Sequence, residues 1–108
     1  MELNEYQTLA FATAVYDRSL AVLYPALGLA GEAGETANKV KKMFRDDGGV
    51  LTEAKRQEIK KELGDVLWYV AGLAHDAGLT LDEIAEANIA KLGGRKERGT
   101  LRGSGDNR

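Results

Sequence analysis

The sequence contains no cysteine and only one proline among its 108 residues. A disulfide scaffold, a thiolate zinc site and a cysteine nucleophile are therefore excluded. Aromatic residues make up only 6% of the chain, so we expect a core built from Ala, Leu, Val and Ile. No apolar run approaches the roughly 20 residues of a membrane-spanning helix. The first residues, Met-Glu-Leu-Asn-Glu, are acidic and lack the apolar stretch of a signal peptide. We therefore expect a cytoplasmic protein without a membrane partner.

Length and charge indicate one soluble domain. Hydrophobic residues make up 44% of the chain and charged residues 30%, which is typical of a globular protein. The net charge of −2 argues against a general polyanion binder, and no strong signal indicates a nucleic-acid partner. The charge is uneven, since residues 93–108 carry a net +3 and residues 1–92 a net −5.

Apolar residues recur at helical spacing, and no strand-like alternation persists. We expect a first helix over residues 2–18. A second helix should begin near Pro25, a residue favoured in a first turn, and reach about Arg45. The run Asp46-Asp47-Gly48-Gly49 predicts a turn after it.

Two further helices are expected after this turn. Thr52 is the predicted N-cap of a third helix that reaches about Asp76. Thr80 opens a fourth helix through a capping box with Glu83, and Gly93-Gly94 is expected to end it. Short connections favour antiparallel neighbours. We therefore predict an all-α, four-helix bundle-like domain over residues 1–94, followed by a basic, glycine-rich tail over residues 95–108 that is mobile at its end.

Two acidic pairs are the most informative feature. Glu32 and Glu35 lie three residues apart on the second predicted helix, and Glu62 and Asp65 do so on the third, so each pair shares one helix face. If the two helices pack together, four carboxylates meet at one seam. Oxygen-only ligands favour Mg²⁺ or Mn²⁺ over zinc. The alternative is a solvated acidic face, because such pairs are common on acidic helices.

The acidic pairs flank an apolar arc on each helix. The arc of the second helix comprises Ala30, Ala33, Ala37, Val40 and Phe44, and that of the third comprises Ile59, Leu63, Val66, Val70 and Leu73.

A family resemblance is carried by a longer pattern. It consists of Leu27-Gly28-Leu29-Ala30-Gly31-Glu32-Ala33-Gly34-Glu35, then Lys39, then Glu62-Leu63-Gly64-Asp65-Val66-Leu67-Trp68-Tyr69, then Asn88 and Lys91. This E-x-x-E, spacer, E-x-x-D pattern resembles the MazG-type all-α nucleoside triphosphate pyrophosphohydrolases. Their superfamily also includes dimeric dUTPases and phosphoribosyl-ATP pyrophosphohydrolases. The resemblance covers roughly residues 3–95.

The resemblance implies an enzyme that removes unwanted (deoxy)nucleoside triphosphates from the nucleotide pool. Such enzymes hydrolyse the bond between the α and β phosphates, which gives a nucleoside monophosphate and pyrophosphate. Glu32, Glu35, Glu62 and Asp65 match the Mg²⁺ ligands and would form the catalytic centre, with Mn²⁺ as a substitute metal. One carboxylate would accept the proton of the attacking water, and the sequence leaves open which one.

Several further residues are candidates for substrate binding. Lys39 lies one turn beyond Glu35 and either contacts a phosphate or pairs with Glu35. Asn88 and Lys91 match phosphate-contacting positions of the family, with a polar outer helix face as the alternative. Arg95 is a further candidate for a phosphate contact or plain surface.

Aromatic residues could stack on a base. Tyr69 shares the acidic face, whereas Trp68 serves stacking or packing equally well. Gln7 is a weaker candidate for shaping the base pocket.

Alternatives to this function remain open at this point. The chain could be a helical dimerisation or regulatory module without activity, or an enzyme acting on phosphoribosyl-ATP. The resemblance implies a homodimer or homotetramer, and a chain this short would leave apolar helix surface uncovered alone. The tail either covers the phosphates, touches nucleic acid weakly or has no role.

Overall fold

The structure, a computed structural model that describes residues 1–108, is entirely helical. It contains α1 (Leu3–Phe11), a 3-10 turn η1 (Arg18–Leu20), α2 (Leu23–Asp46), α3 (Glu53–Asp76) and α4 (Leu81–Arg98). The predicted all-α, four-helix class is confirmed. None of these helices is long and apolar enough to span a membrane.

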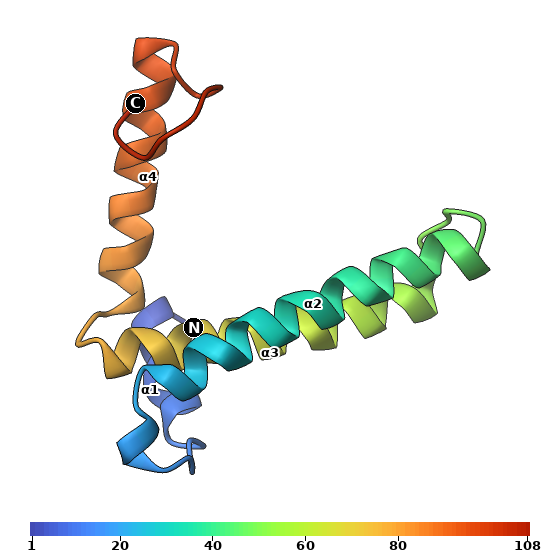
Figure 1. Cartoon of the computed structure of the whole chain (residues 1–108), viewed down its shortest axis with the longest axis horizontal. Coiled ribbons are helices and arrows are strands. Elements are labelled where there is room, and N and C mark those ends of the chain that lie inside the picture. Colours follow the sequence, from blue (N-terminus) through green and yellow to red (C-terminus); the bar gives the residue numbers. More distant parts are fainter.

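Helices α2 and α3 form a long antiparallel hairpin, and α1 packs across the end where α3 finishes (Figure 1). The connecting turn lies where it was predicted, with Gly48 and Gly49 at φ 62° and 79°. The Thr52 hydroxyl accepts a 3.1 Å hydrogen bond from the Lys55 amide, so the predicted N-cap of α3 is confirmed. Helix α4 projects away from the hairpin (Figure 1).

Helix α1 is shorter than predicted, because it ends at Phe11 and not near residue 18. The following segment is held by distant partners. The carboxylate of Asp76, at the end of α3, accepts hydrogen bonds from the Tyr16 hydroxyl at 2.6 Å and the Val22 amide at 3.0 Å. Helix α2 then begins at Leu23, two residues before Pro25.

Helix α4 is longer than predicted. It passes through Gly93 and Gly94 and ends at Arg98, where Gly99 adopts the left-handed conformation with φ 71°. Only a residue that leaves right-handed helical geometry terminates the helix in this way, and neither Gly93 nor Gly94 does so. Arg95 therefore lies inside α4, not after it. The predicted cap at the other end is confirmed, since the Thr80 hydroxyl accepts a 3.1 Å hydrogen bond from the Glu83 amide.

The buried core of a single chain is small. Its core cluster consists of the buried residues Ala10, Ala71, Ala74 and Leu81, which lie where α1, the end of α3 and the start of α4 meet. Gln7 is also buried there, and its side chain donates to the Leu79 carbonyl at 3.0 Å and accepts from the Leu81 amide at 2.9 Å. This glutamine thus anchors the start of α4, and its suggested role in shaping a base pocket stays a prediction.

The apolar arc of α2 does not pack against α3. All five of its residues are exposed, and Phe44 retains 66% of its accessible surface. The flank that carries Glu32 and Lys39 is half-buried instead. Helix α2 is therefore rotated so that a partly polar flank meets α3 and the apolar arc faces outward.

Candidate functional site

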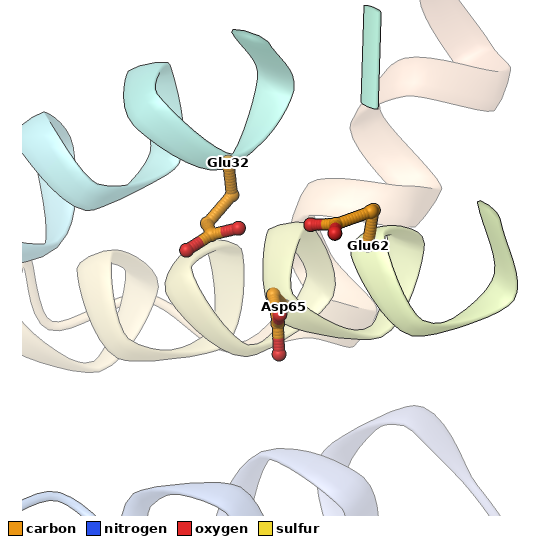
Figure 2. A group of neighbouring side chains, drawn as sticks. All are labelled: Glu32, Glu62 and Asp65. Carbon is orange, nitrogen blue, oxygen red and sulfur yellow. The ribbon is translucent and has the colours of Figure 1, made fainter. Parts of the chain in front are cut away.

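Three carboxylates from two helices converge at the α2–α3 seam. Glu32 reaches from α2 toward α3, and Glu62 projects from α3 on the side of α2 (Figure 2). Asp65 follows three residues after Glu62 on α3. One carboxylate oxygen from each of the three residues lies within 4.8 Å of the others. This is the arrangement of oxygen donors that a hard divalent cation takes.

The electrostatics of the seam fit such a cation. The pKa of the Glu32 carboxyl is raised, first because burial disfavours its charged form and then because Asp65 and Glu62 carry like charges nearby. Three acidic groups at this separation repel one another, and a divalent cation between them would remove that repulsion. With no histidine or cysteine among the donors, Mg²⁺ or Mn²⁺ suits the set better than zinc.

Glu35 lies outside this cluster. It is exposed on α2, one turn beyond Glu32, although its charge is close enough to contribute to the raised pKa of Glu32. The fold therefore brings together three of the four predicted ligands, Glu32, Glu62 and Asp65, and leaves Glu35 next to the cluster but outside it.

Four aromatic rings lie next to the acidic seam. Tyr69, Trp68, Tyr16 and Tyr24 are neighbours, with ring centroids 5.0 Å apart for Trp68 and Tyr69 and 4.8 Å apart for Tyr16 and Tyr24. They line a hollow of about 290 Å³ together with Thr13, Val15, Asp17 and Leu20. Tyr69 connects the hollow to the seam, because its pKa is raised first by burial, then by a hydrogen bond with Tyr24 and by the charges of Glu32 and Asp65.

Sequence reasoning missed two members of this hollow. Tyr16 was placed inside an expected helix, and Tyr24 just before another. The available signal was the scarcity of aromatic residues, since four of the seven in the chain gather here. Trp68 is also engaged in packing, because its indole donates to the Thr13 hydroxyl at 2.8 Å and the Ala10 carbonyl at 3.1 Å.

Comparison with known proteins agrees with this geometry. Residues 23–100 match the family model of the MazG nucleotide pyrophosphohydrolase domain. The chain belongs to the MazG family. It is also 46% identical, over the whole length of both chains, to the "Gene 37 protein" of Mycobacterium phage L5. No solved structure matches the chain.

The matched MazG region includes every predicted ligand and phosphate contact, from α2 to α4. Lys39 is half-buried in α2 and forms no ion pair. The predicted alternative, a pair with Glu35, is therefore absent. Lys39 instead faces α3, where its charge contributes to lowering the pKa of Glu58, after the hydrogen bond and charge of Lys55.

The three α4 residues predicted to contact phosphate lie away from the carboxylate cluster. Asn88 and Lys91 are exposed on α4, and this helix projects away from the hairpin (Figure 1). Arg95 lies one turn further and is only 4% exposed, because segment 99–108 covers it. A single chain thus does not bring these three side chains to the carboxylate cluster.

Proposed function

We propose that this protein is a Mg²⁺-dependent (deoxy)nucleoside triphosphate pyrophosphohydrolase that releases a nucleoside monophosphate and pyrophosphate. The observation that carries the proposal is the convergence of the Glu32, Glu62 and Asp65 oxygens within 4.8 Å. Membership of the MazG family supports the reaction class.

The residues divide into metal-binding and substrate-binding groups. Glu32, Glu62 and Asp65 would hold the metal, and the exposed Glu35 is free to complete its ligation or to accept the proton of the attacking water. A bound Mg²⁺ supplies neutralisation of the phosphate charge and a water of lowered pKa. The base would lie in the aromatic hollow against Tyr69, whose position next to the seam keeps base and phosphates on adjoining surfaces.

We also infer that the protein works as a homo-oligomer. The exposed arc of α2 offers an apolar surface that a single chain leaves uncovered. The isolated fold separates the cations of α4 from the carboxylates, and the α4 of a second copy would bring Lys91 and Arg95 to them. Dimer or tetramer would both meet this requirement.

The function is tested by Glu62→Gln, which keeps the shape of the side chain but removes its charge. We expect at least a hundredfold loss of pyrophosphate release across a panel of triphosphates, because one metal ligand is lost. The panel includes phosphoribosyl-ATP, which would identify that alternative substrate. Glu86→Gln is the matched control and should retain activity, because Glu86 is exposed on α4, three residues after the exposed Glu83.

Circular dichroism must show an unchanged helical signal in both variants. Full Mg²⁺-dependent turnover by Glu62→Gln would refute the role of the cluster. A wild-type chain that hydrolyses no member of the panel would favour the non-catalytic module.

A further inference from the structure

The segment after α4 folds back along the helix that precedes it (Figure 1). Its Asp106 carboxylate meets two cations of α4. One oxygen, Oδ1, lies 3.4 Å from Lys91 Nζ and 3.4 Å from Arg95 Nη2. Lys91 and Arg95 are one helical turn apart, so their side chains share a face and present their charges to the same anion.

This contact buries the Arg95 side chain, but it does not provide a hydrogen-bond acceptor for every donor of the guanidinium. Its Nη2 donates to Asp106 Oδ1 and to the main-chain oxygens of Gly105 and Asp106. Its Nε is buried and has no acceptor. A guanidinium offers Nε and Nη2 as a fork that fits two oxygens of one carboxylate or phosphate group. Asp106 therefore fills only part of the anion position that Arg95 presents.

The contact is also loose on the side of the acid. The Asp106 side chain is 85% exposed, and its 3.4 Å distances are longer than the roughly 2.8 Å of a strong charge-assisted hydrogen bond. Its pKa is lowered, first by the charge of Lys91 and then by hydrogen bonds from Lys91 and Arg95. Asp106 thus stays charged at neutral pH and remains a competitor for any other anion.

Segment 99–108 is closed by hydrogen bonds of its own. The Arg108 guanidinium donates to the carbonyls of Thr100, Leu101 and Gly105 at 3.0, 2.9 and 2.7 Å. The segment leaves α4 at Gly99, a residue in the left-handed conformation. A closed loop attached at one glycine can leave the helix as a unit when its contacts with the side chains of Lys91, Arg95 and Arg98 break.

We propose that Asp106 occupies an anion-binding position formed by Arg95 and Lys91, and that a phosphate group of the substrate must displace segment 99–108 to bind there. A phosphate group carries more charge than a carboxylate and has enough oxygens for Arg95 Nε, Arg95 Nη2 and Lys91 Nζ together. The segment would therefore act as an autoinhibitory strap. This inference rests on the proposed function, in which Lys91 and Arg95 contact the triphosphate.

The test compares wild type with Asp106→Ala in the full chain. Calorimetry measures the Kd for inorganic triphosphate without Mg²⁺, and pyrophosphate release gives KM and kcat with nucleotide. We expect a three- to tenfold lower Kd and KM in Asp106→Ala, with kcat unchanged. Asn107→Ala, a neighbouring exposed change, should match wild type. In a Lys91→Ala background the effect of Asp106→Ala should shrink.

Each outcome decides one proposal. Equal Kd and KM values for wild type and Asp106→Ala would overturn the strap, while hydrolysis by both would leave the proposed function intact. Tighter binding of inorganic triphosphate by Asp106→Ala, in a chain that hydrolyses no nucleotide, would support the strap and refute the proposed function. An equal gain in the Lys91→Ala background would overturn the assigned anion position.

Discussion

Gly28 provides the space in which the ring of Tyr69 lies. A Cβ at this position would overlap the ring atoms Cδ1, Cε1 and Cζ of Tyr69, so a larger residue must displace the ring. Tyr69 lies between the aromatic hollow and the carboxylate seam. The absence of a side chain at Gly28 therefore determines the shape of the proposed base pocket.

Gly28→Ala should therefore weaken nucleotide binding. We expect KM to rise about tenfold, which corresponds to about 1.4 kcal/mol, with a smaller effect on kcat because the metal ligands are untouched. Steady-state kinetics with the preferred triphosphate measure both. Gly93→Ala is the control, since a Cβ there meets nothing within 4 Å, and it should stabilise α4 by up to about 1 kcal/mol. An unchanged KM in Gly28→Ala would remove Tyr69 from the pocket.

Asp76 makes the free energy of unfolding depend on pH. Burial alone would raise its pKa, but hydrogen bonds from Arg18, Tyr16 and the Val22 amide outweigh burial and lower the pKa to about 2. A depressed folded-state pKa adds stability above the unfolded pKa of about 3.9, and that stability is lost as the pH falls from about 4 toward 2. The shift corresponds to about 2 kcal/mol at neutral pH.

Asp76→Asn should remove this contribution. We expect the variant to lose about 2 kcal/mol of unfolding free energy at pH 7 and to show a flatter dependence between pH 4 and pH 2. Urea unfolding at pH 7, 4 and 3 measures both quantities. Identical slopes for wild type and variant over this range would show that other carboxylates carry the acid sensitivity.

At the scale of helices, the α2–α3 pair holds like charges in its own seam. Binding a divalent cation there would stabilise the folded pair over the unfolded chain, by about 2.7 kcal/mol at a concentration of one hundred times Kd. Mg²⁺ should therefore raise the melting temperature, and EDTA should reverse the rise. Glu62→Gln should show a reduced response, whereas Glu86→Gln should respond like wild type. A melting temperature insensitive to Mg²⁺ would contradict the metal site.

The sequence predicted those elements whose signals are local. The caps at Thr52 and Thr80 and the Gly48-Gly49 turn depend on residues within a few positions of one another, and the structure confirms them. The end of α1 could not be predicted in this way. The segment that follows α1 is held by a hydrogen bond from Tyr16 to Asp76, 60 residues further along the chain, and no local pattern indicates such a bond.

Only part of the candidate site could be predicted, because local spacing does not specify how the helices are oriented toward one another. The spacing of each acidic pair places its members on one face, but the rotation of α2 depends on what covers its apolar arc. The periodicity identified the residues of that arc but not the direction in which it faces, and in the structure all of them are exposed. Glu35 and the α4 residues likewise depend on arrangements that helical periodicity does not specify.

The whole molecule is extended for its length. Its radius of gyration is 16.7 Å, against about 13 Å for a compact domain of this size. Only eight of the 108 residues are buried, which leaves a single chain with little hydrophobic stabilisation. Both observations support the proposed homo-oligomer, in which another copy would complete the core.

Phe44→Glu should disrupt that assembly, because it places a charge in the apolar arc of α2. We expect light scattering to find an oligomer for wild type at micromolar concentration and a lower mass, or loss of folding, for the variant. Lys41→Glu, an exposed charge change on the same helix, is the control and should keep the wild-type mass. A wild-type monomer would contradict the proposed assembly.

The outward arc of α2 has a consequence for how much working enzyme a cell contains. If two chains must meet before either is complete, the number of finished sites at low expression grows with the square of the chain concentration. Diluting the enzyme in an assay should then lower its activity per milligram, while adding an inactive Glu62→Gln chain with an intact arc should restore part of it.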